Sequence, residues 1–395
     1  MLSLFLIFLR LGCTSFGGPV AHLGYFHREF VVERKWFTEA EYTELLALCH
    51  FLPGPASSQV GMAVGYRQAG VLGSLIAFVG FTLPSVLLMI GAAFALQYSA
   101  DLSFVEGVLH AMKLLAVAVV ADAVWGMAKK ICITRLKFTI TILTAVLVLV
   151  SPNLVSSGLM GSALAVQLLA IGGAGCVGAI ALKQGAPKVE QLTRQSTPKL
   201  SALFLVAFFV LLFGLPFISQ TSGSVELSLF DTFYRAGGLV FGGGHVVLPM
   251  LQAEPLISSN LSQDQFLTAY SLAQAVPGPM FTIASYLGYV VENSWINAVV
   301  ATLAIFFPGW LLVIATLSVW PKLKSNMYIA GAVQGIVAAT VGLLVAALYQ
   351  PVFSSAVLNA VDMAIVLLVW TAVAVARLPI WAVVVITATF GGLFL

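Results

Sequence analysis

Two stretches of this sequence each place an arginine and a glycine-rich break inside apolar sequence. Arg10 precedes Phe16-Gly17-Gly18-Pro19, and Arg235 precedes Phe241-Gly242-Gly243-Gly244, at an offset of 225 (235 − 10). Lipid tolerates neither an unpaired charge nor unpaired backbone groups, and a guanidinium group matches oxyanion geometry. The alternatives are arginines that extend to the interface and glycines that allow close helix packing. The candidate anion-binding residues are Arg10, Phe16, Gly17, Gly18, Arg235, Gly242, Gly243 and Gly244.

A second repeated motif should break a membrane helix. Pro53-Gly54-Pro55 and Pro277-Gly278-Pro279 lie 224 residues apart (277 − 53). Each proline removes a backbone donor and disfavours helix before it, so the helix should end and restart. The restarted helix presents free N–H groups and the positive end of its dipole to an anion. We expect these six residues to bind substrate.

Polar side chains flank both Pro-Gly-Pro motifs. Ser57, Ser58 and Gln59 follow the first, Gln274 precedes the second, and Thr282 and Ser285 follow it. Their hydroxyl and amide groups can donate to an oxyanion, and capping of freed backbone groups is an equal alternative. We include Ser57, Ser58, Gln59 and Gln274 among the candidate substrate-binding residues.

Four titratable residues are candidates for binding a proton: His22, His50, Asp122 and Asp231. For His22 the alternative is a satisfied or lumen-facing histidine. Asp122 shares a predicted helix with Lys113, nine residues away, so we expect each to pair with a neighbouring helix instead. Asp231 lies four residues before Arg235, which suits an ion pair within one helix.

Composition indicates what must position these residues. The 395-residue chain is 60% hydrophobic and 8% charged, with a mean hydropathy of +1.04, against about 25% charged residues in soluble domains. We expect an all-α polytopic membrane protein of about 13 transmembrane helices. The predicted helices cover residues 2–20, 43–65, 70–97, 104–127, 136–151, 158–182, 201–218, 229–249, 265–289, 296–319, 328–349, 355–374 and 378–395.

Further landmarks recur at nearly the same offset and indicate an internal duplication. Gly65-Tyr66 matches Gly288-Tyr289, and Val105 to His110 aligns with Ile329 to Gln334. Each half then holds six helices, while 201–218 has no counterpart. One extra crossing makes the second half begin on the opposite side, so the repeats should be inverted. The predicted segments are a first repeat at 1–182, a cytoplasmic linker with the connecting helix at 183–228, and a second repeat at 229–395.

Basic loops predict the orientation. Lysine and arginine residues gather in four loops that fall on one side of the membrane in the thirteen-helix topology, and the positive-inside rule makes that side cytoplasmic. The N-terminus is then inside and the C-terminus outside. Residues 27–44 mix both charges on the predicted outer side, and we interpret them as an amphipathic interfacial segment.

Several function classes are disfavoured. The four cysteines lack metal-ligand or CxxC spacing, so we expect no metal and no cofactor. A GxxxxGK[ST] motif is absent, which argues against ATP as the driving force. HExxH and GxSxG are also absent, which argues against an intramembrane enzyme. The net charge of +3 does not suggest nucleic acid, and a homodimer remains an option for the assembly.

Across residues 10–66 and 235–289 the sequence resembles the chromate ion transporter family, whose fused halves each carry a Gly-rich and a Pro-Gly-Pro motif. The resemblance rests on Phe16 to Pro19 with His22, on Leu52 to Pro55 with Gln59 and Gly61, and on their second-half counterparts, which include Leu248-Pro249 and Gln274 to Pro279. One departure is His50, which stands where the second half has Gln274.

The resemblance implies a secondary transporter that exports chromate across the cytoplasmic membrane of a prokaryote and so confers chromate resistance. Sulfate is a related substrate, and protons or the membrane potential are the implied driving force. A passive anion channel and a sulfate or other oxyanion transporter are the alternatives.

Overall fold

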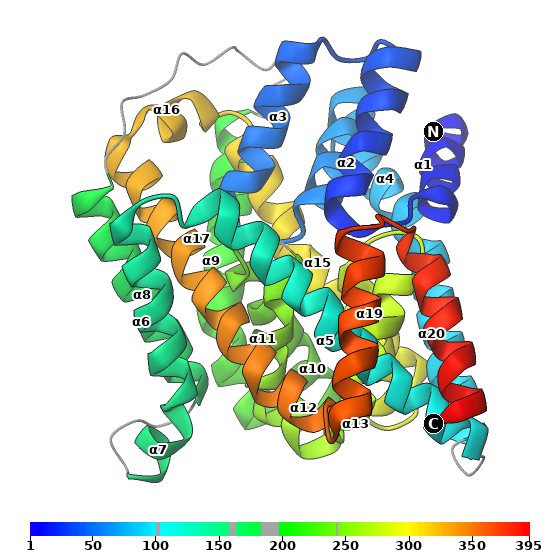
Figure 1. Ribbon diagram of the computed structural model, residues 1–395. Coiled ribbons are helices and arrows are strands. Elements are labelled where there is room, and N and C mark those ends of the chain that lie inside the picture. Colours follow the sequence, from blue (N-terminus) through cyan, green and yellow to red (C-terminus); the bar gives the residue numbers. More distant parts are fainter. Residues whose placement is uncertain (100–102, 158–162, 183–196, 242–243) are drawn as a thin grey trace. The chain divides into compact units, whose positions relative to one another are not determined.

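The computed structural model describes residues 1–99, 103–157, 163–182, 197–241 and 244–395, and the described residues are helical without β-strands (Figure 1). Five helices are long and apolar enough to span a membrane: Ala56–Gln97, Phe104–Ile131, Pro198–Ser222, Trp295–Thr316 and Met327–Ala356. Shorter apolar helices accompany them. This is the architecture expected of a polytopic membrane protein.

The chain folds into two compact units, each built from segments of both sequence halves. Unit 1 contains Met1–Ala92, Gly185–Gly244 and Val276–Asn326, and unit 2 contains the remainder. Whereas the predicted segments follow one another along the sequence, each unit combines parts of both repeats.

Unit 1 contains the broken motifs of both repeats. Its helices from the first half are α1 (Leu2–Thr14), α2 (Gly18–His27), η1 (Arg28–Glu33), α3 (Glu39–Phe51) and α4 (Ala56–Ser99), which continues beyond the unit. Its later helices are α9 (Pro198–Ser222), α10 (Val225–Leu239), η3 (Met280–Thr282), α14 (Ile283–Val290), α15 (Trp295–Thr316) and α16 (Trp320–Ser325).

Both Pro-Gly-Pro motifs interrupt helices, as predicted. Thr38 and Glu41 form a capping box that starts α3, and α3 ends before the first motif, after which α4 begins at Ala56. The second motif separates α13 (Gln263–Ala275) from η3 and α14. The predicted helices 43–65 and 265–289 are therefore each two helices.

Each restarted helix folds back on the next one. The backbone of α4 turns at Gly70, where φ is +65°, and Gly65 then packs directly against the backbone of Gly73. In the second half Gly288 of α14 packs against Asn297 of α15, at offsets of 223 (288 − 65) and 224 (297 − 73). A side chain at either glycine would clash with a carbonyl oxygen, which explains the recurrence of glycine at both places.

The helix before each Gly-rich motif crosses its partner at an equivalent point. A methyl group on Gly12 of α1 would lie 2.6 Å from the carbonyl oxygen of Phe81 in α4. A methyl group on Gly237 of α10 would overlap the carbonyl oxygen of Ile305 in α15. The offsets are 225 (237 − 12) and 224 (305 − 81), so the duplication seen in the sequence extends to the helix contacts of unit 1.

Unit 2 is a second bundle of helices. They are α5 (Ser103–Ile131), α6 (Arg135–Leu149), α7 (Ser151–Ser156), α8 (Ala163–Ala181), α11 (Val247–Gln252), α12 (Pro255–Asn260), α13, α17 (Met327–Ala347), η4 (Leu348–Phe353), α18 (Ser354–Ala356), α19 (Ala360–Ala374) and α20 (Ile380–Phe394). The 3₁₀ turn η2 (Gly244–Val246) lies at the boundary between the units. Within unit 2, α17 packs against α6 and α8, while α5 packs against α13, α19 and α20 (Figure 1).

All thirteen predicted ranges contain helix. Besides 43–65 and 265–289, two further ranges are interrupted: the predicted helix 2–20 ends at Thr14 and resumes at Gly18, and in the predicted helix 229–249 the first helix ends at Leu239. In the mixed-charge segment, His27 pairs with Glu39 and Arg28 pairs with Glu33. Its charges therefore largely neutralise one another.

Candidate functional site

The two repeats are bonded to each other at their breaks within unit 1. The Gly54 N–H of the first Pro-Gly-Pro motif donates to the carbonyl of Val240, at 2.7 Å, beside the second Gly-rich motif. Reciprocally, the Gly278 N–H donates to the carbonyl of Ser15, at 2.9 Å, beside the first. Neither of these two amides is therefore free for a ligand, because each is satisfied by the other repeat.

Glycine is required at the breaks for backbone reasons. Gly54 has φ of +116° and Gly278 has φ of +97°, in the region that side chains disfavour. A methyl group on Gly278 would also overlap the hydroxyl oxygen of Ser85. The predicted site glycines therefore set the path of the chain and let the repeats approach closely.

Beside the first break lies a buried group that we name the first-repeat polar cluster: Ser15, His22, Ser57, Ser58 and Gln59. All five side chains are at most 3% exposed. His22 lies 3.2 Å from the Ser15 carbonyl through Nε2 and 3.5 Å from Ser57 Oγ through Nδ1. Because a carbonyl only accepts, Nε2 carries the proton and Nδ1 accepts from Ser57.

Several polar groups of this cluster have no protein partner. Within the described residues, Ser15 Oγ, Ser58 Oγ and Gln59 Oε1 are buried without a hydrogen bond. The first amide of α4 to reach a carbonyl is that of Gln59, bonded to Pro55 at 2.9 Å, and the described chain places no acceptor against the N–H groups of Ala56, Ser57 or Ser58. Such groups are costly unless water or a ligand satisfies them.

The hydroxyl group that corresponds to Ser58 in the second repeat is satisfied. Thr282, which corresponds to Ser58, donates to the carbonyl of Pro279 at 2.7 Å. Ser285 lies 2.8 Å from the hydroxyl of Thr302. The hydroxyl groups of Thr282 and Ser285 are therefore bonded to protein groups, whereas those of Ser15 and Ser58 beside the first break have no partner among the described residues.

Side chains that differ between the repeats cap the first proline of each motif. Gln59 Nε2 donates to the carbonyl of Pro53 at 2.8 Å. Ser85 Oγ donates to the carbonyl of Pro277 at 2.5 Å. Gln59 is thus held by its amide nitrogen while its oxygen stays unpaired.

Arg10 does not carry an unpaired charge. Its guanidinium group donates to Glu29 Oε2, and Arg34 donates to Glu29 Oε1 at 2.7 Å. The Glu29 side chain is 5% exposed whereas that of Arg10 is 58% exposed. This bridge was not anticipated, although the mixed charges of 27–44 include both Glu29 and Arg34.

Arg235 forms the predicted ion pair. Its Nε lies 3.0 Å from Asp231 Oδ1 and its Nη2 lies 3.1 Å from Oδ2. Ser219 of α9 adds a hydrogen bond of 3.4 Å to the same carboxylate. Helix α9 has no counterpart in the first half, and the ion pair that it contacts has none there either. Leu6 stands at the position equivalent to Asp231.

The remaining predicted residues are dispersed. His50 is exposed at the end of α3, and Asp122 is half-buried on α5. In unit 2, Gln274 Nε2 lies 3.3 Å from His245 Nδ1, which also contacts the hydroxyl of Tyr270. Phe16 precedes the turn that begins α2 at Gly18. Gly242 and Gly243 lie outside the described residues, and Gly244 begins η2.

Lys113 pairs with a neighbouring helix as predicted. Its Nζ lies 3.0 Å from Asp264 Oδ1 of α13.

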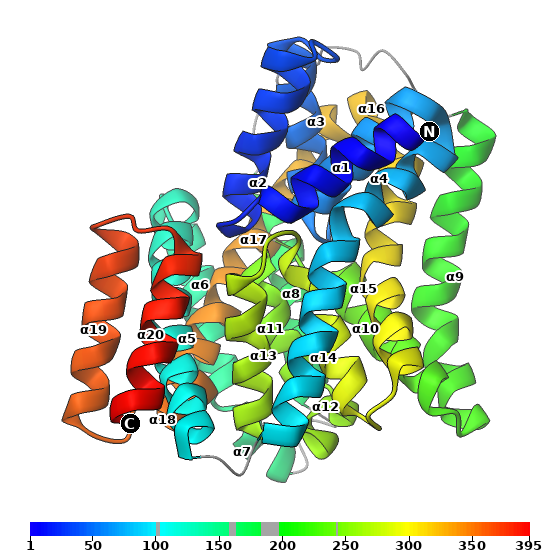
Figure 2. The same ribbon diagram turned by 90° about the vertical axis from the view of Figure 1, so that its right-hand side faces the viewer.

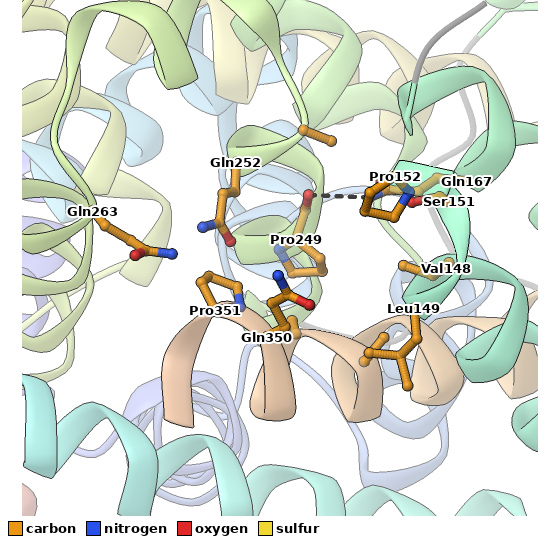
Figure 3. A pocket seen from close by; sticks show the side chains of 13 residues that line it. Val148, Leu149, Ser151, Pro152, Gln167, Pro249, Gln252, Gln263, Gln350 and Pro351 are labelled. Atoms are coloured by element: carbon orange, nitrogen blue, oxygen red, sulfur yellow. Dashed lines mark hydrogen bonds between the residues drawn. The ribbon is translucent and has the colours of Figure 1, made fainter. Parts of the chain in front are cut away.

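A polar pocket in unit 2 was not predicted from the sequence. The cavity has a volume of about 270 Å³, and no charged residue lines it. Gln252, Gln263 and Gln350 extend into it, and Gln167 donates to the carbonyl of Pro249 (Figure 3). The glutamines lie far apart in the sequence, so no local motif indicated this pocket. None of the residues that line it belongs to the Gly-rich or Pro-Gly-Pro motifs.

Comparison with known proteins identifies the family. The model of the family described as chromate transporter matches residues 2–179 and 227–393. The chain belongs to the chromate transporter family. The two matches begin 225 residues apart (227 − 2), the offset that links the two arginines.

Curated relatives cover most of the chain. The chain is 29% identical over 342 residues to a probable chromate transport protein of Synechococcus elongatus, covering 86% of this chain and 81% of the relative. It is 28% identical to the chromate transport proteins of Cupriavidus metallidurans and Pseudomonas aeruginosa, covering 87% of this chain and 81% and 79% of those proteins. No solved structure matches.

Family membership and the apolar helices together identify an integral membrane transport protein rather than an enzyme. The substrate of such a family is an oxyanion. This transporter therefore needs a desolvated site for an anion, and the first-repeat polar cluster offers unsatisfied donors.

Proposed function

We propose that this protein is a secondary active transporter that exports chromate from the cytoplasm, with sulfate as a related substrate, and that it confers chromate resistance. The observation that carries the proposal is the contrast between the breaks: Ser58 Oγ is buried without a partner, whereas Thr282 Oγ1 in the second repeat is bonded. The oxyanion accepts hydrogen bonds at the start of α4, where the helix dipole favours negative charge.

In this proposal the substrate is held by the N–H groups of Ala56 to Ser58 and by the hydroxyl groups of Ser15 and Ser58, whereas the Ser57 hydroxyl donates to His22. The crossed bonds of Gly54 and Gly278 keep the two breaks together. Arg10 and Arg235 have a structural role, because each guanidinium group is already paired with a carboxylate. A tetrahedral dianion suits this site, because it accepts several hydrogen bonds at once.

The proposed repeats are inverted. Support comes from helices that correspond at an offset of about 224. Within unit 1 the second half of α4 and α15 run in opposite directions (Figure 2). Within unit 2, α6 and α19 also run in opposite directions (Figure 1). Inverted repeats permit alternating access by exchange of the conformations of the two halves.

The proposed membrane orientation follows the basic loops. The N-terminus lies in the cytoplasm and the C-terminus lies outside, across thirteen helices in the cytoplasmic membrane. The inner end of α5 carries Lys129 and Lys130, so its other end, which begins at Ser103, faces outward.

Counterflow in proteoliposomes tests the proposed function. A carrier exchanges substrate, so vesicles preloaded with unlabelled chromate or sulfate should take up labelled chromate severalfold faster than empty vesicles. With the membrane potential held at zero by a potassium ionophore and equal potassium on both sides, a passive channel gives no such acceleration by substrate on the far side. Uptake that equals protein-free vesicles for both oxyanions would contradict transport of either one.

A further inference from the structure

Unit 2 contains a histidine–carboxylate pair that the proposed substrate site does not use. His110 Nε2 of α5 lies 2.9 Å from Asp362 Oδ1 of α19. The Asp362 side chain is 2% exposed and that of His110 is 22% exposed. An ionisable pair within apolar membrane helices is costly, which makes it a candidate for a function in transport.

The surroundings of Asp362 stabilise its charged form. Its Oδ2 accepts the Leu358 N–H at 2.9 Å, and it lies in the first turn of α19, which Asn359 caps. Helix N-termini favour negative charge. Asp362 therefore stays a carboxylate, and the atom of the pair that can accept a further proton is a ring nitrogen of His110.

The ring of His110 has one nitrogen available for that proton. Since a carboxylate only accepts, Nε2 carries hydrogen in both protonation states. In the described part of the chain, no hydrogen bond to Nδ1 is formed. Protonation at Nδ1 changes the pair from a net charge of −1 to neutral, and a neutral pair is less costly to enclose in lipid.

The charged groups near the pair lie on α5 itself and on two of the helices that pack against it. On α5 itself, Glu106 lies one turn before His110 and is exposed, and Lys113 lies one turn after it. Among the elements packed against α5, only α13 and α19 supply charged residues, Asp264 and Asp362. Tyrosines of these elements, Tyr270, Tyr328 and Tyr349, are uncharged at neutral pH.

The same helix is fastened to the helix that leads into the second break. Lys113 pairs with Asp264 of α13, and Ser271 of α13 donates to the carbonyl of Met112 at 2.6 Å. In sequence α13 ends at Ala275, directly before the second Pro-Gly-Pro motif. A movement of α5 relative to α19 therefore acts on the helix that precedes that motif.

Neither residue of the pair has a matching residue at the equivalent position of the other repeat. At an offset of 224, His110 corresponds to Gln334, and Asp362 corresponds to Phe138. His110 lies about 9 Å along α5 from Phe104, by helical rise, toward the end that the proposed topology directs outward. Protons from outside can thus reach it.

We propose that the His110–Asp362 pair is the proton-binding site that couples transport to the proton gradient. This inference rests on the proposed function and on protons as its implied driving force, and it adds the residues that bind the proton. Protonation at Nδ1 from outside permits one conformational change, and release of that proton inside permits the return.

The test compares exchange with gradient-driven transport in proteoliposomes. The variants are His110→Gln, which introduces the residue found at the repeat position, and Asp362→Asn. His27→Gln is the matched control, because His27 forms a histidine–carboxylate pair with Glu39 that is exposed. Three quantities are measured: chromate counterflow without a gradient, chromate accumulation driven by a pH gradient, and chromate-linked proton movement reported by an entrapped pH dye.

The proposal predicts that His110→Gln and Asp362→Asn keep counterflow within about twofold of wild type, because exchange needs no net proton movement. Accumulation and proton movement fall to the level of protein-free vesicles. His27→Gln retains all three. Gradient-driven accumulation that persists in His110→Gln overturns the proposal. Loss of counterflow in both variants also overturns it, because that result means that the pair is structural. Absence of counterflow in the wild type instead overturns the proposed function.

Discussion

At the scale of single residues, the account depends on the difference between Ser58 and Thr282. Both are buried hydroxyl residues at equivalent positions after a break, but Ser58 has no partner and Thr282 caps Pro279. A buried hydroxyl without a protein partner does not stabilise the fold and is costly unless water or a ligand satisfies it, whereas a capping hydroxyl contributes about 1 kcal/mol.

We predict that Ser58→Ala raises the KM for chromate about tenfold or more, because a hydrogen bond to a charged group contributes about 1.5–3 kcal/mol. The thermal unfolding midpoint should change little. Initial uptake rates over a range of chromate concentrations and unfolding in detergent provide the measurements.

Thr282→Val is the matched control for Ser58→Ala. It should lower the unfolding midpoint and leave the KM within about twofold of wild type, since its hydroxyl is already bonded. A Ser58→Ala protein with unchanged KM would remove Ser58 from the binding site.

The ion pair of Arg235 gives a second prediction at this scale. Asp231→Leu and Arg235→Met should each destabilise the protein by about 3–5 kcal/mol, because either removes one partner of a largely buried ion pair. The double variant should recover most of that stability and should transport chromate. Unfolding midpoints and uptake rates of all three variants test this.

Leu6 gives a physical reason to expect this recovery, because the first repeat already accommodates leucine at the equivalent position. A double variant that is stable but cannot transport chromate would show that Arg235 acts on the substrate directly.

At the scale of elements, the breaks require glycine. Gly278→Ala should reduce the yield of folded protein and transport by at least fivefold, because it combines a positive φ with overlap on Ser85 Oγ. Adding Ser85→Ala removes the overlap and should restore part of the yield. Folded yield is measured by size-exclusion chromatography of the solubilised protein.

Gly91→Ala on α4 is the control, because a methyl group there meets open space. It should leave the yield unchanged or raise it, since alanine favours helix over glycine. Equal yields for Gly91→Ala and Gly278→Ala would contradict the proposed role of the break.

The elements also show what the sequence could predict. Proline and glycine act locally, so the interruptions at Pro53 to Pro55 and Pro277 to Pro279 were readable from residue type alone. The crossed bonds of Gly54 and Gly278 were not, because their acceptors lie far away in sequence. The partner of Arg235 is in its own helix and was predicted, whereas Glu29, which binds Arg10 from another helix, was not.

At the scale of the whole molecule, inversion of the repeats can be tested with one pair of positions. Ile133 and Leu358 correspond at an offset of 225 (358 − 133), and their exposed fractions are 70% and 71%. In a variant without the four native cysteines, Ile133→Cys should react with impermeant thiol reagents only from the cytoplasmic side. Leu358→Cys should react only from outside.

Labelling of both positions from the same side would mean parallel repeats and would exclude the proposed topology. Because the two positions are equally exposed, a difference in labelling between them reports the side of the membrane and not the accessibility of the side chain.

The central claim is that the protein is a gradient-driven chromate exporter, and the most direct measurement is chromate uptake into everted membrane vesicles with and without an imposed proton gradient. The account predicts accumulation that requires the gradient, decreases when sulfate competes, and collapses when an ionophore dissipates the gradient. Uptake that never exceeds equilibration, with the protein present in the membrane, would contradict active export.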